Sequence, residues 1–225
     1  MRDLEAIALL QDPARRSLYE YVVGQGREVS RNEAAEAVGL QRTLAAFHLD
    51  RLAASGLLEV GFRRLTSRAG PGAGRPAKLY RRAKTERMYS APPRDYARAA
   101  RVFAEAIERS GAEPVLYDVA RARGIAAARA LARDAADADR VSLDELLRHL
   151  TASGYEPYAD AGSVRLRNCP FESVAQEFAA VTCGMNLALV EGMLEGADLS
   201  AAFEARLEPR PGECCVSIAS KTNTS

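Results

Sequence analysis

The residues with the clearest chemistry are four cysteines near the C-terminus. Thirteen residues separate Cys169 from Cys183, and thirty more precede the adjacent pair Cys214 and Cys215. The chain has no other cysteine, and neither of its two histidines lies between these four. Thiolates bind zinc and iron–sulfur clusters, and they are also the reactive form of redox-sensitive cysteines. The C-terminal quarter is therefore the first place to look for a functional site.

The cysteine spacing favours an iron–sulfur cluster over a structural zinc site. Zinc sites usually contain pairs of cysteines two to four residues apart, and this pattern is missing. Well-separated thiolates without a nearby imidazole fit an iron–sulfur cluster, which prefers thiolate ligands. A zinc or other metal site, a thiol redox switch, and a purely structural role as small buried side chains are the alternatives.

Each cysteine falls at an expected change of structure. Cys169 precedes Pro170 at an expected helix start, where the helix dipole would favour its thiolate. Cys183 is expected within that helix. Cys214 and Cys215 follow a turn and are expected to enter a strand, in which successive side chains point to opposite faces. We therefore expect only one of this pair to join the other two cysteines easily.

The elements expected around the cysteines form a mixed α+β domain over residues 139–225. Ser142 and Glu145 form a capping box at the start of one helix. A longer helix is expected from about Phe171 to Glu195, with a break near Ala180. Four short strands complete the pattern, at residues 155–158, 164–166, 203–207 and 214–218.

Two helices are expected before this domain, at residues 94–110 and 113–135. In the first, small and apolar side chains recur at steps of three and four residues. We expect this stripe to form a homodimer interface, because two-fold DNA-binding proteins present two recognition helices to one operator. An ordinary core position is the alternative. The stripe comprises Tyr96, Ala99, Ala100, Phe103, Ala106 and Ile107.

The N-terminal region predicts a winged helix–turn–helix. Asp12 and Pro13 begin a helix that runs to about residue 23, and Ser30 with Glu33 forms a capping box for the next. A third helix, at about residues 41–54, is the expected recognition helix. Two strands follow at residues 57–62 and 78–82, joined by a basic loop rich in glycine and proline. This geometry places one helix in the DNA major groove.

The side chains expected to contact DNA lie on that third helix and around the basic loop. Arg42 can bond guanine, Gln41 can bond adenine, and Phe47 can contact a thymine methyl group. Arginines near the loop would contact phosphates or the minor groove. The full expected set is Gln41, Arg42, Thr43, Phe47, His48, Arg51, Arg64, Arg68, Arg75 and Lys78.

The charge distribution agrees with a polyanionic partner for the N-terminal region. Residues 1–90 contain 16 Lys and Arg against 10 Asp and Glu, a net charge of +6. Residues 91–225 contain 15 against 20, a net charge of −5. No apolar run approaches the roughly 20 residues of a membrane-spanning helix, and no signal peptide is evident. We therefore expect a cytoplasmic protein without a membrane partner.

Two stretches carry a family resemblance. The segments GLQRTLAAFHLDRLAASGLLEV and GRPAKLYRR make residues 8–85 resemble the ArsR-type winged-helix regulators. The recognition helix lacks the cysteines that many metal-sensing members carry, so their metal site does not transfer. The motifs NCPF, CGMN and PGECCV resemble the C-terminal region of iron–sulfur-dependent repressors of cluster-assembly operons. That resemblance implies a [4Fe–4S] cluster on Cys169, Cys183 and Cys214, with Cys215 additional.

These observations predict a mainly α fold with small β elements. The expected parts are a winged helix–turn–helix domain (1–90), a helical dimerisation region (91–138) and an α+β sensor domain (139–225). The expected function is that of a homodimeric regulator, in the manner of a repressor, that binds a double-stranded DNA operator and senses cluster or redox status. A zinc site, thiol switch or small-molecule domain in the C-terminal region is the alternative. An enzyme with Cys169 as nucleophile is disfavoured, because no histidine base lies nearby.

Overall fold

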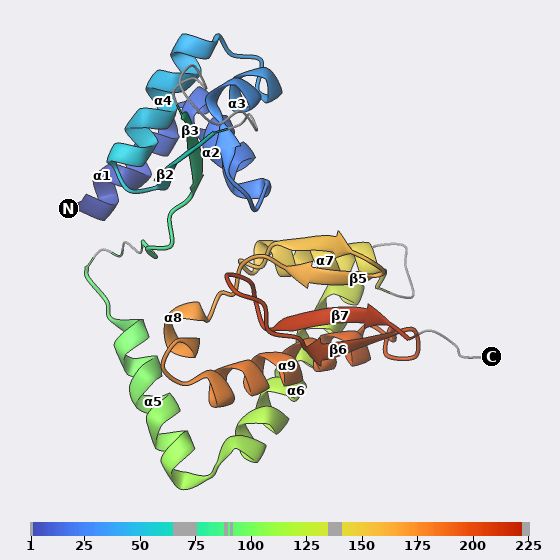
Figure 1. Ribbon diagram of the computed structural model, residues 1–225. Helices are drawn as coiled ribbons and strands as arrows, with labels where there is room; N and C mark the ends of the chain where they lie inside the picture. Colours follow the sequence, from blue (N-terminus) through green and yellow to red (C-terminus); the bar gives the residue numbers. More distant parts are fainter. Residues whose placement is uncertain (1, 65–75, 88–89, 91, 135–140, 222–225) are drawn as a thin grey trace. The chain divides into compact units, whose positions relative to one another are not determined.

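The computed structural model describes residues 2–64, 76–87, 90, 92–134 and 141–221. The chain divides into two compact units, Met1–Arg94 and Asp95–Ser225 (Figure 1). The segment expected as a separate helical region, 91–138, is thus divided, and its described residues 95–134 belong to the second unit. Each unit is described by itself below.

The helices of the first unit begin where local capping chemistry predicts. The Asp12 side chain accepts a hydrogen bond from the Arg15 backbone N–H at 3.0 Å, and the Ser30–Glu33 capping box is formed. An additional short helix, which the sequence pattern did not indicate, precedes them. The helical elements are α1 (Arg2–Ala8), the 3₁₀ turn η1 (Leu9–Gln11), α2 (Pro13–Gly24), α3 (Arg31–Ala37) and α4 (Arg42–Ala54).

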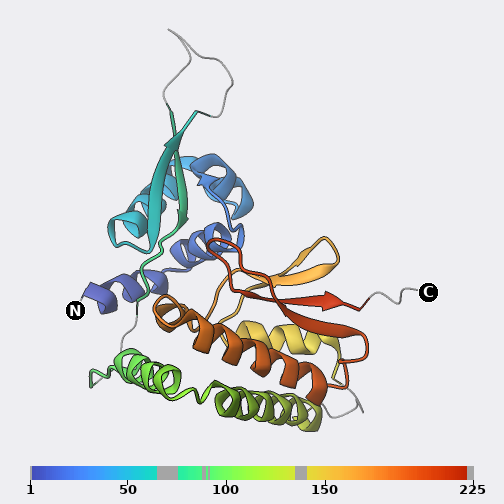
Figure 2. The ribbon, with the colours of Figure 1, turned by 60° about the horizontal axis from the view of Figure 1, so that its bottom comes forward.

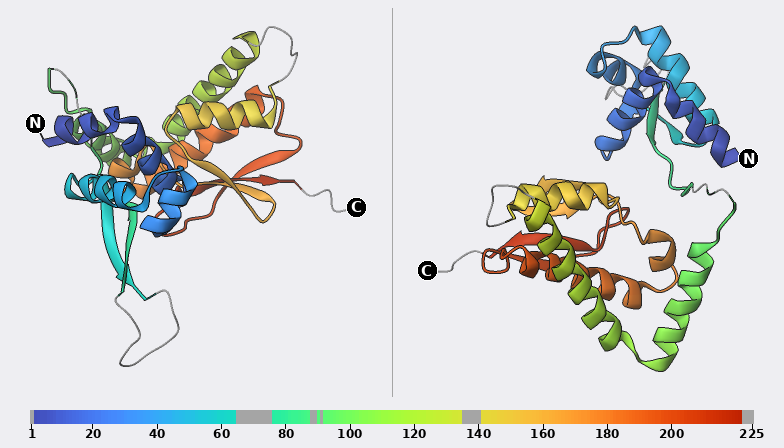
Figure 3. Two further views of the ribbon diagram at one scale, coloured as in Figure 1. Left: turned by 90° about the horizontal axis from the view of Figure 1, so that it is seen from above. Right: turned by 180° about the vertical axis from the view of Figure 1, so that it is seen from behind.

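A small antiparallel sheet completes the first unit. Its strands are β1 (Val29–Ser30), β2 (Leu58–Arg63) and β3 (Ala77–Arg82), in the order β1-β3-β2. The β2–β3 ribbon extends beyond the helices of its own unit (Figure 3). Tyr80 of β3 is fully buried, and its hydroxyl donates a hydrogen bond to Asp50 Oδ1 of α4 at 2.7 Å. This bond fixes the sheet against α4.

The second unit contains five helices and four strands among its described residues. The helices are α5 (Tyr96–Ser110), α6 (Glu113–Asp134), α7 (Leu143–Ala152), α8 (Glu172–Ala175) and α9 (Ala179–Gly196). The break between α8 and α9 lies next to the expected one at Ala180. The strands are β4 (Pro157–Asp160), β5 (Ser163–Leu166), β6 (Phe203–Leu207) and β7 (Val216–Ser220), all antiparallel in the order β4-β5-β7-β6.

One face of this sheet forms the core with the helices. Leu166 of β5 and Val216 and Ile218 of β7 are buried in one cluster with Leu146 of α7 and Val190 of α9. Because side chains alternate along a strand, the intervening residues of β5 and β7 lie on the opposite face. The helices therefore cover one face of the sheet, and side chains on the opposite face make the polar contacts described below.

The closest contact in the second unit joins α6 and α9, which lie side by side (Figure 2). A Cβ built on Gly124 of α6 would lie 2.1 Å from the Leu189 carbonyl oxygen, and one on Gly192 of α9 would lie 2.1 Å from the Arg121 carbonyl oxygen. Real Cβ atoms essentially never approach so closely. The two backbones therefore touch at positions where only glycine fits.

The fold is thus a helix-rich α/β mixture with two small antiparallel sheets. In the described part of the chain, none of the helices combines the length and apolar character needed to cross a membrane.

Replacement of Gly124 by alanine tests the α6–α9 contact. The added methyl group meets backbone rather than a movable side chain, so we expect a loss of about 1–3 kcal/mol in the free energy of unfolding. Urea denaturation followed by circular dichroism measures the change. Gly24→Ala is the control, because nothing lies within 4 Å of a Cβ at that helical position. If the Gly124 variant were as stable as the wild type, the two helices would be able to shift apart and accommodate the methyl group without loss of stability.

Candidate functional site

The four cysteines, from three separate segments, form one continuous group of thiols. Cys169 precedes α8, Cys183 lies in α9, and Cys214 with Cys215 precedes β7. The thiol of Cys214 interacts electrostatically with those of Cys169 and Cys215, and that of Cys215 interacts with Cys183. No disulfide joins them, since all four are free. The folded chain thus gathers sulfur atoms that the sequence separates by up to 45 residues.

Nitrogen donors point at the sulfur of Cys214. The Asn186 side-chain Nδ2 donates a hydrogen bond to Cys214 Sγ at 3.2 Å, and the nearby Val216 backbone N–H also lowers the pKa of this thiol. The Tyr155 hydroxyl donates to Asn186 Oδ1 at 2.6 Å, which orients the amide. Both Tyr155 and Asn186 are buried. Such donors stabilise negative charge on sulfur, whether in a thiolate or in a metal-bound thiolate.

The electrostatics make Cys214 the first thiol to ionise. Hydrogen bonds from Cys169 and Cys215 lower its pKa to about 3, although the side chain is only 1% exposed. The same bonds to Cys214, together with burial, raise the pKa of Cys169 and of Cys215. Burial and the neighbouring cysteines raise the pKa of Tyr155, so its phenol stays protonated and remains a donor. These effects favour ionisation of Cys214 over that of Cys169 and Cys215.

The structure differs from two expectations about individual cysteines. Cys215 as well as Cys214 interacts electrostatically with other thiols, because β7 begins only at Val216 and strand alternation does not apply to the pair. Cys169 is not the favoured thiolate, because its thiol is bonded to Cys214 and the following helix α8 has only four residues. The fourth cysteine is therefore a full member of the group.

The donor set fits a sulfur-ligated metal centre in composition. Four thiols with N–H donors directed at sulfur are the ligands and supporting groups that iron–sulfur clusters use. Among the described residues, however, no three His, Cys, Asp or Glu side chains are arranged to hold a single metal ion. A bound cluster would therefore require the thiols to rearrange from these positions.

Asn186 and Tyr155 are site residues that the sequence pattern did not indicate. The signal for Asn186 was an amide within the otherwise apolar run from Met185 to Val190. Tyr155 offered no comparable signal, because its partner lies 31 residues away. Both roles depend on the packing of α9 against the segment that follows α7.

The second candidate surface is the outer face of α4 in the first unit. Of the residues expected to contact DNA, those at the N-terminal end of α4 are exposed, and so is Arg51. Phe47 is 54% exposed, and the Arg51 guanidinium lies 5.7 Å from the centre of its ring. An aromatic ring held at the surface beside an arginine can stack on or contact bases. The exposed members are Gln41, Arg42, Thr43, Phe47 and Arg51.

Other residues of the expected DNA-binding set differ in their placement. His48 is only 7% exposed, so it lies on the inner side of α4 rather than on the outer face. Lys78 is paired with Asp50, so part of its charge is neutralised within the unit. Arg64 is exposed just after β2. Arg68 and Arg75 lie outside the described residues.

A third surface is the apolar face of α5 and the start of α6. Tyr96 and Phe103 of α5 are 67% and 66% exposed, and Val102 is also exposed. Val115 and Val119 continue the apolar character on α6. Large apolar side chains gathered on one exposed surface usually mark an interaction site. The expected stripe on α5 is thus partly exposed in the single chain.

Comparisons with known proteins identify no relative. No protein-family model, curated protein or solved structure matches this chain.

Proposed function

We propose that this chain is a homodimeric DNA-binding transcriptional regulator whose C-terminal thiol group binds an iron–sulfur cluster. The observation that carries the proposal is the gathering of four thiols from three segments, with N–H donors directed at the central sulfur. The resemblance of the sequence to ArsR-type regulators and to iron–sulfur-dependent repressors agrees with this reading. Control of DNA binding by the state of the thiol group is part of the proposal.

The residues that would hold the cluster are Cys169, Cys183 and Cys214, with Cys215 next to them. Such a cluster supplies a link between chain segments that depends on iron supply and redox state. Asn186 would support the ligand sulfur of Cys214, since its amide is already oriented by Tyr155. The acidic charge of residues 91–225 suits a sensing role better than contact with phosphate.

A thiol redox switch is the second candidate, because the thiols influence one another. Cys169 and Cys214 shift each other's pKa, which places them in one neighbourhood, and disulfides need sulfur atoms that can approach closely. An oxidant would convert such a pair to a disulfide without any metal. Metal analysis separates this candidate from the cluster proposal.

The DNA-binding role rests on the outer face of α4 and the charge of its unit. Residues 1–90 carry a net charge of +6, and the exposed side chains of α4 include both hydrogen-bonding and aromatic groups. A basic unit with a helix presented beside an antiparallel ribbon has the parts of a winged helix–turn–helix. In this reading Arg42 and Gln41 contact bases, and Arg51 and Arg64 contact phosphates.

The partner of the exposed α5 face is proposed to be a second copy of the chain. Two copies of α5 related by a two-fold axis would present the same apolar surface to each other. The apolar side chains Tyr96, Val102 and Phe103 would lie between the two helices.

Anaerobic purification tests the cluster. We expect a coloured protein that contains iron and acid-labile sulfide, and we expect Cys169→Ser, Cys183→Ser and Cys214→Ser each to remove most of the bound iron. These variants should still fold but lose cluster-dependent DNA binding in a gel shift. Thr182→Ser, adjacent to Cys183, is the control and should keep its iron. Colourless wild-type protein with four titratable thiols would favour the thiol switch.

Alanine at Arg42 tests the DNA interface. Loss of a base contact should cost about 1–3 kcal/mol of specific affinity, with little change in binding to unrelated DNA. An operator selected from random duplexes, followed by salt titrations of binding, provides the measurement. Arg148→Ala removes an equally exposed arginine from α7 and is the control. Equal effects of the two changes would argue against recognition by α4.

Glutamate at Phe103 tests the dimer. A charge placed on the apolar face should disfavour association, because it would be buried without a partner. Analytical ultracentrifugation should then show a shift from dimer to monomer. Leu207→Glu alters another exposed apolar side chain of the same unit and should leave the mass unchanged. A dimeric Phe103 variant would place the interface elsewhere.

A further inference from the structure

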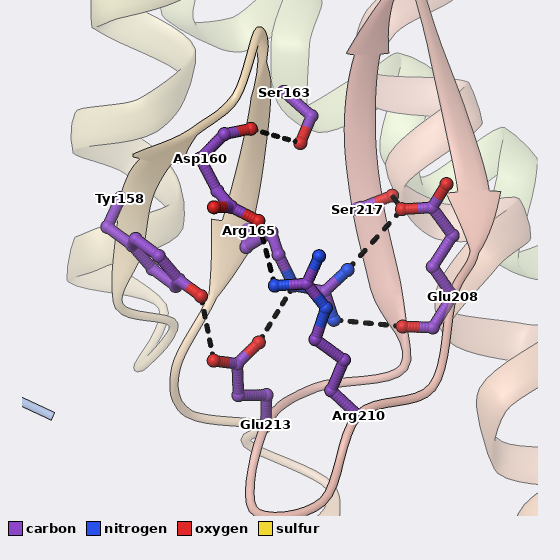
Figure 4. Close-up of polar contacts among 8 residues, drawn as sticks. All are labelled: Tyr158, Asp160, Ser163, Arg165, Glu208, Arg210, Glu213 and Ser217. Atoms are coloured by element: carbon purple, nitrogen blue, oxygen red, sulfur yellow. Dashed lines mark hydrogen bonds and ion pairs between the residues drawn. The ribbon is translucent and has the colours of Figure 1, made fainter. Parts of the chain in front are cut away.

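Arg165 of β5 is a charged side chain in an unusual place. It is 0% exposed, although it lies on the face of the sheet opposite the apolar core. A guanidinium stays charged in proteins, and its burial is unfavourable unless its N–H groups are paired. The segment that joins β6 to β7, residues 208–215, supplies both acidic partners (Figure 4).

The contacts of Arg165 reach both ends of that segment. At one end, its Nη2 donates to the Glu208 carbonyl oxygen at 2.9 Å, and its Nη1 lies 3.4 Å from Glu208 Oε2. At the other end, its Nε donates to Glu213 Oε2 at 2.8 Å. Ser217 and Tyr158 hold the two carboxylates, through hydroxyl donors at 2.8 and 2.7 Å.

The same segment carries two of the four thiols. Glu213 directly precedes Cys214 and Cys215. The Cys214 backbone N–H donates to the Leu166 carbonyl oxygen at 2.9 Å, next to Arg165 on β5. The Glu208 N–H donates to the Cys215 carbonyl oxygen at 2.7 Å, which closes the segment into a loop. The backbone of Cys214 is therefore tied to the strand that carries Arg165, and the backbone of Cys215 is tied to Glu208, a partner of Arg165.

We propose that Arg165 is a positioning residue that holds the Cys214–Cys215 segment in place for the thiol group. Its guanidinium binds Glu208 at the start of the segment and Glu213 near its end, and these contacts keep the two thiols beside Cys169 and Cys183. Arginine suits this role better than lysine, because its planar fork serves two acceptors in different directions. The assignment rests on the proposed function, in which these thiols form the sensing site.

Thiol labelling of the metal-free, reduced full-length chain tests this role. N-ethylmaleimide labelling with fragment mass spectrometry resolves each cysteine. We expect Arg165→Met to accelerate labelling of Cys214 and Cys215 by about tenfold or more, because the buried pairing is lost. Hydrogen exchange should increase in residues 208–216 while α6 and α9 keep their protection.

The control is Arg210→Met, in the same segment. Arg210 pairs with Asp160 at 2.8 Å but its side chain is 51% exposed, so its loss should leave the labelling rates unchanged. Wild-type labelling rates in the Arg165 variant would overturn the proposal. So would equal opening of α9, which would indicate a general loss of structure.

If Arg165→Met does not fold, Glu213→Gln tests the positioning role of Arg165 instead. This change keeps the shape of the side chain and removes the charge that faces Arg165, so selective labelling of the cysteine pair should again increase. Unchanged labelling would overturn the role of the ion pair. The labelling is done on metal-free protein. Absence of iron from the wild-type protein would therefore refute the proposed function, but the labelling would still test the role of Arg165.

Discussion

The contact between α6 and α9 is the constraint on which the second unit depends. Gly124 and Gly192 bring the two backbones together, and Gly196 continues the contact against Ile125. A close backbone approach leaves little freedom to slide, because any added atom meets a main-chain group. It fixes α9 in register, and α9 carries Cys183 and Asn186. The position of the thiol group is therefore set by packing that involves no cysteine.

The rest of the site is built from elements attached to this helix pair. The register of β5 and β7 places Arg165 opposite Ser217 and aligns the segment before β7 with Leu166. Helix α9, the segment before α8 and the segment before β7 then meet at Cys214. The Asn186 amide of α9 donates a hydrogen bond to Cys214 Sγ at that point.

The first unit is organised by a different interaction, the buried Tyr80 hydroxyl on Asp50. Burial opposes ionisation of Asp50, yet hydrogen bonds from Lys78 and Tyr80 keep its pKa below the ordinary value. The half-exposed carboxylate thus joins α4 to β3. Phe47 and Arg51 remain on the outer side. A rigid helix with a free outer face is the requirement for recognition of a DNA groove.

The sequence by itself determined the starts of several helices and the turn between β4 and β5, because those signals act within a few residues. Asp12 with Arg15, and Ser30 with Glu33, satisfy helix termini locally, and the positive φ of Gly162 turns β4 into β5. Only the tertiary structure decided which side chains meet. The burial of His48, the pairing of Arg165 and the membership of Cys215 in the thiol group all depend on helix packing and strand register. Helix packing and strand register bring together residues that are tens of positions apart in the sequence. A local sequence pattern does not encode how close such residues lie in space.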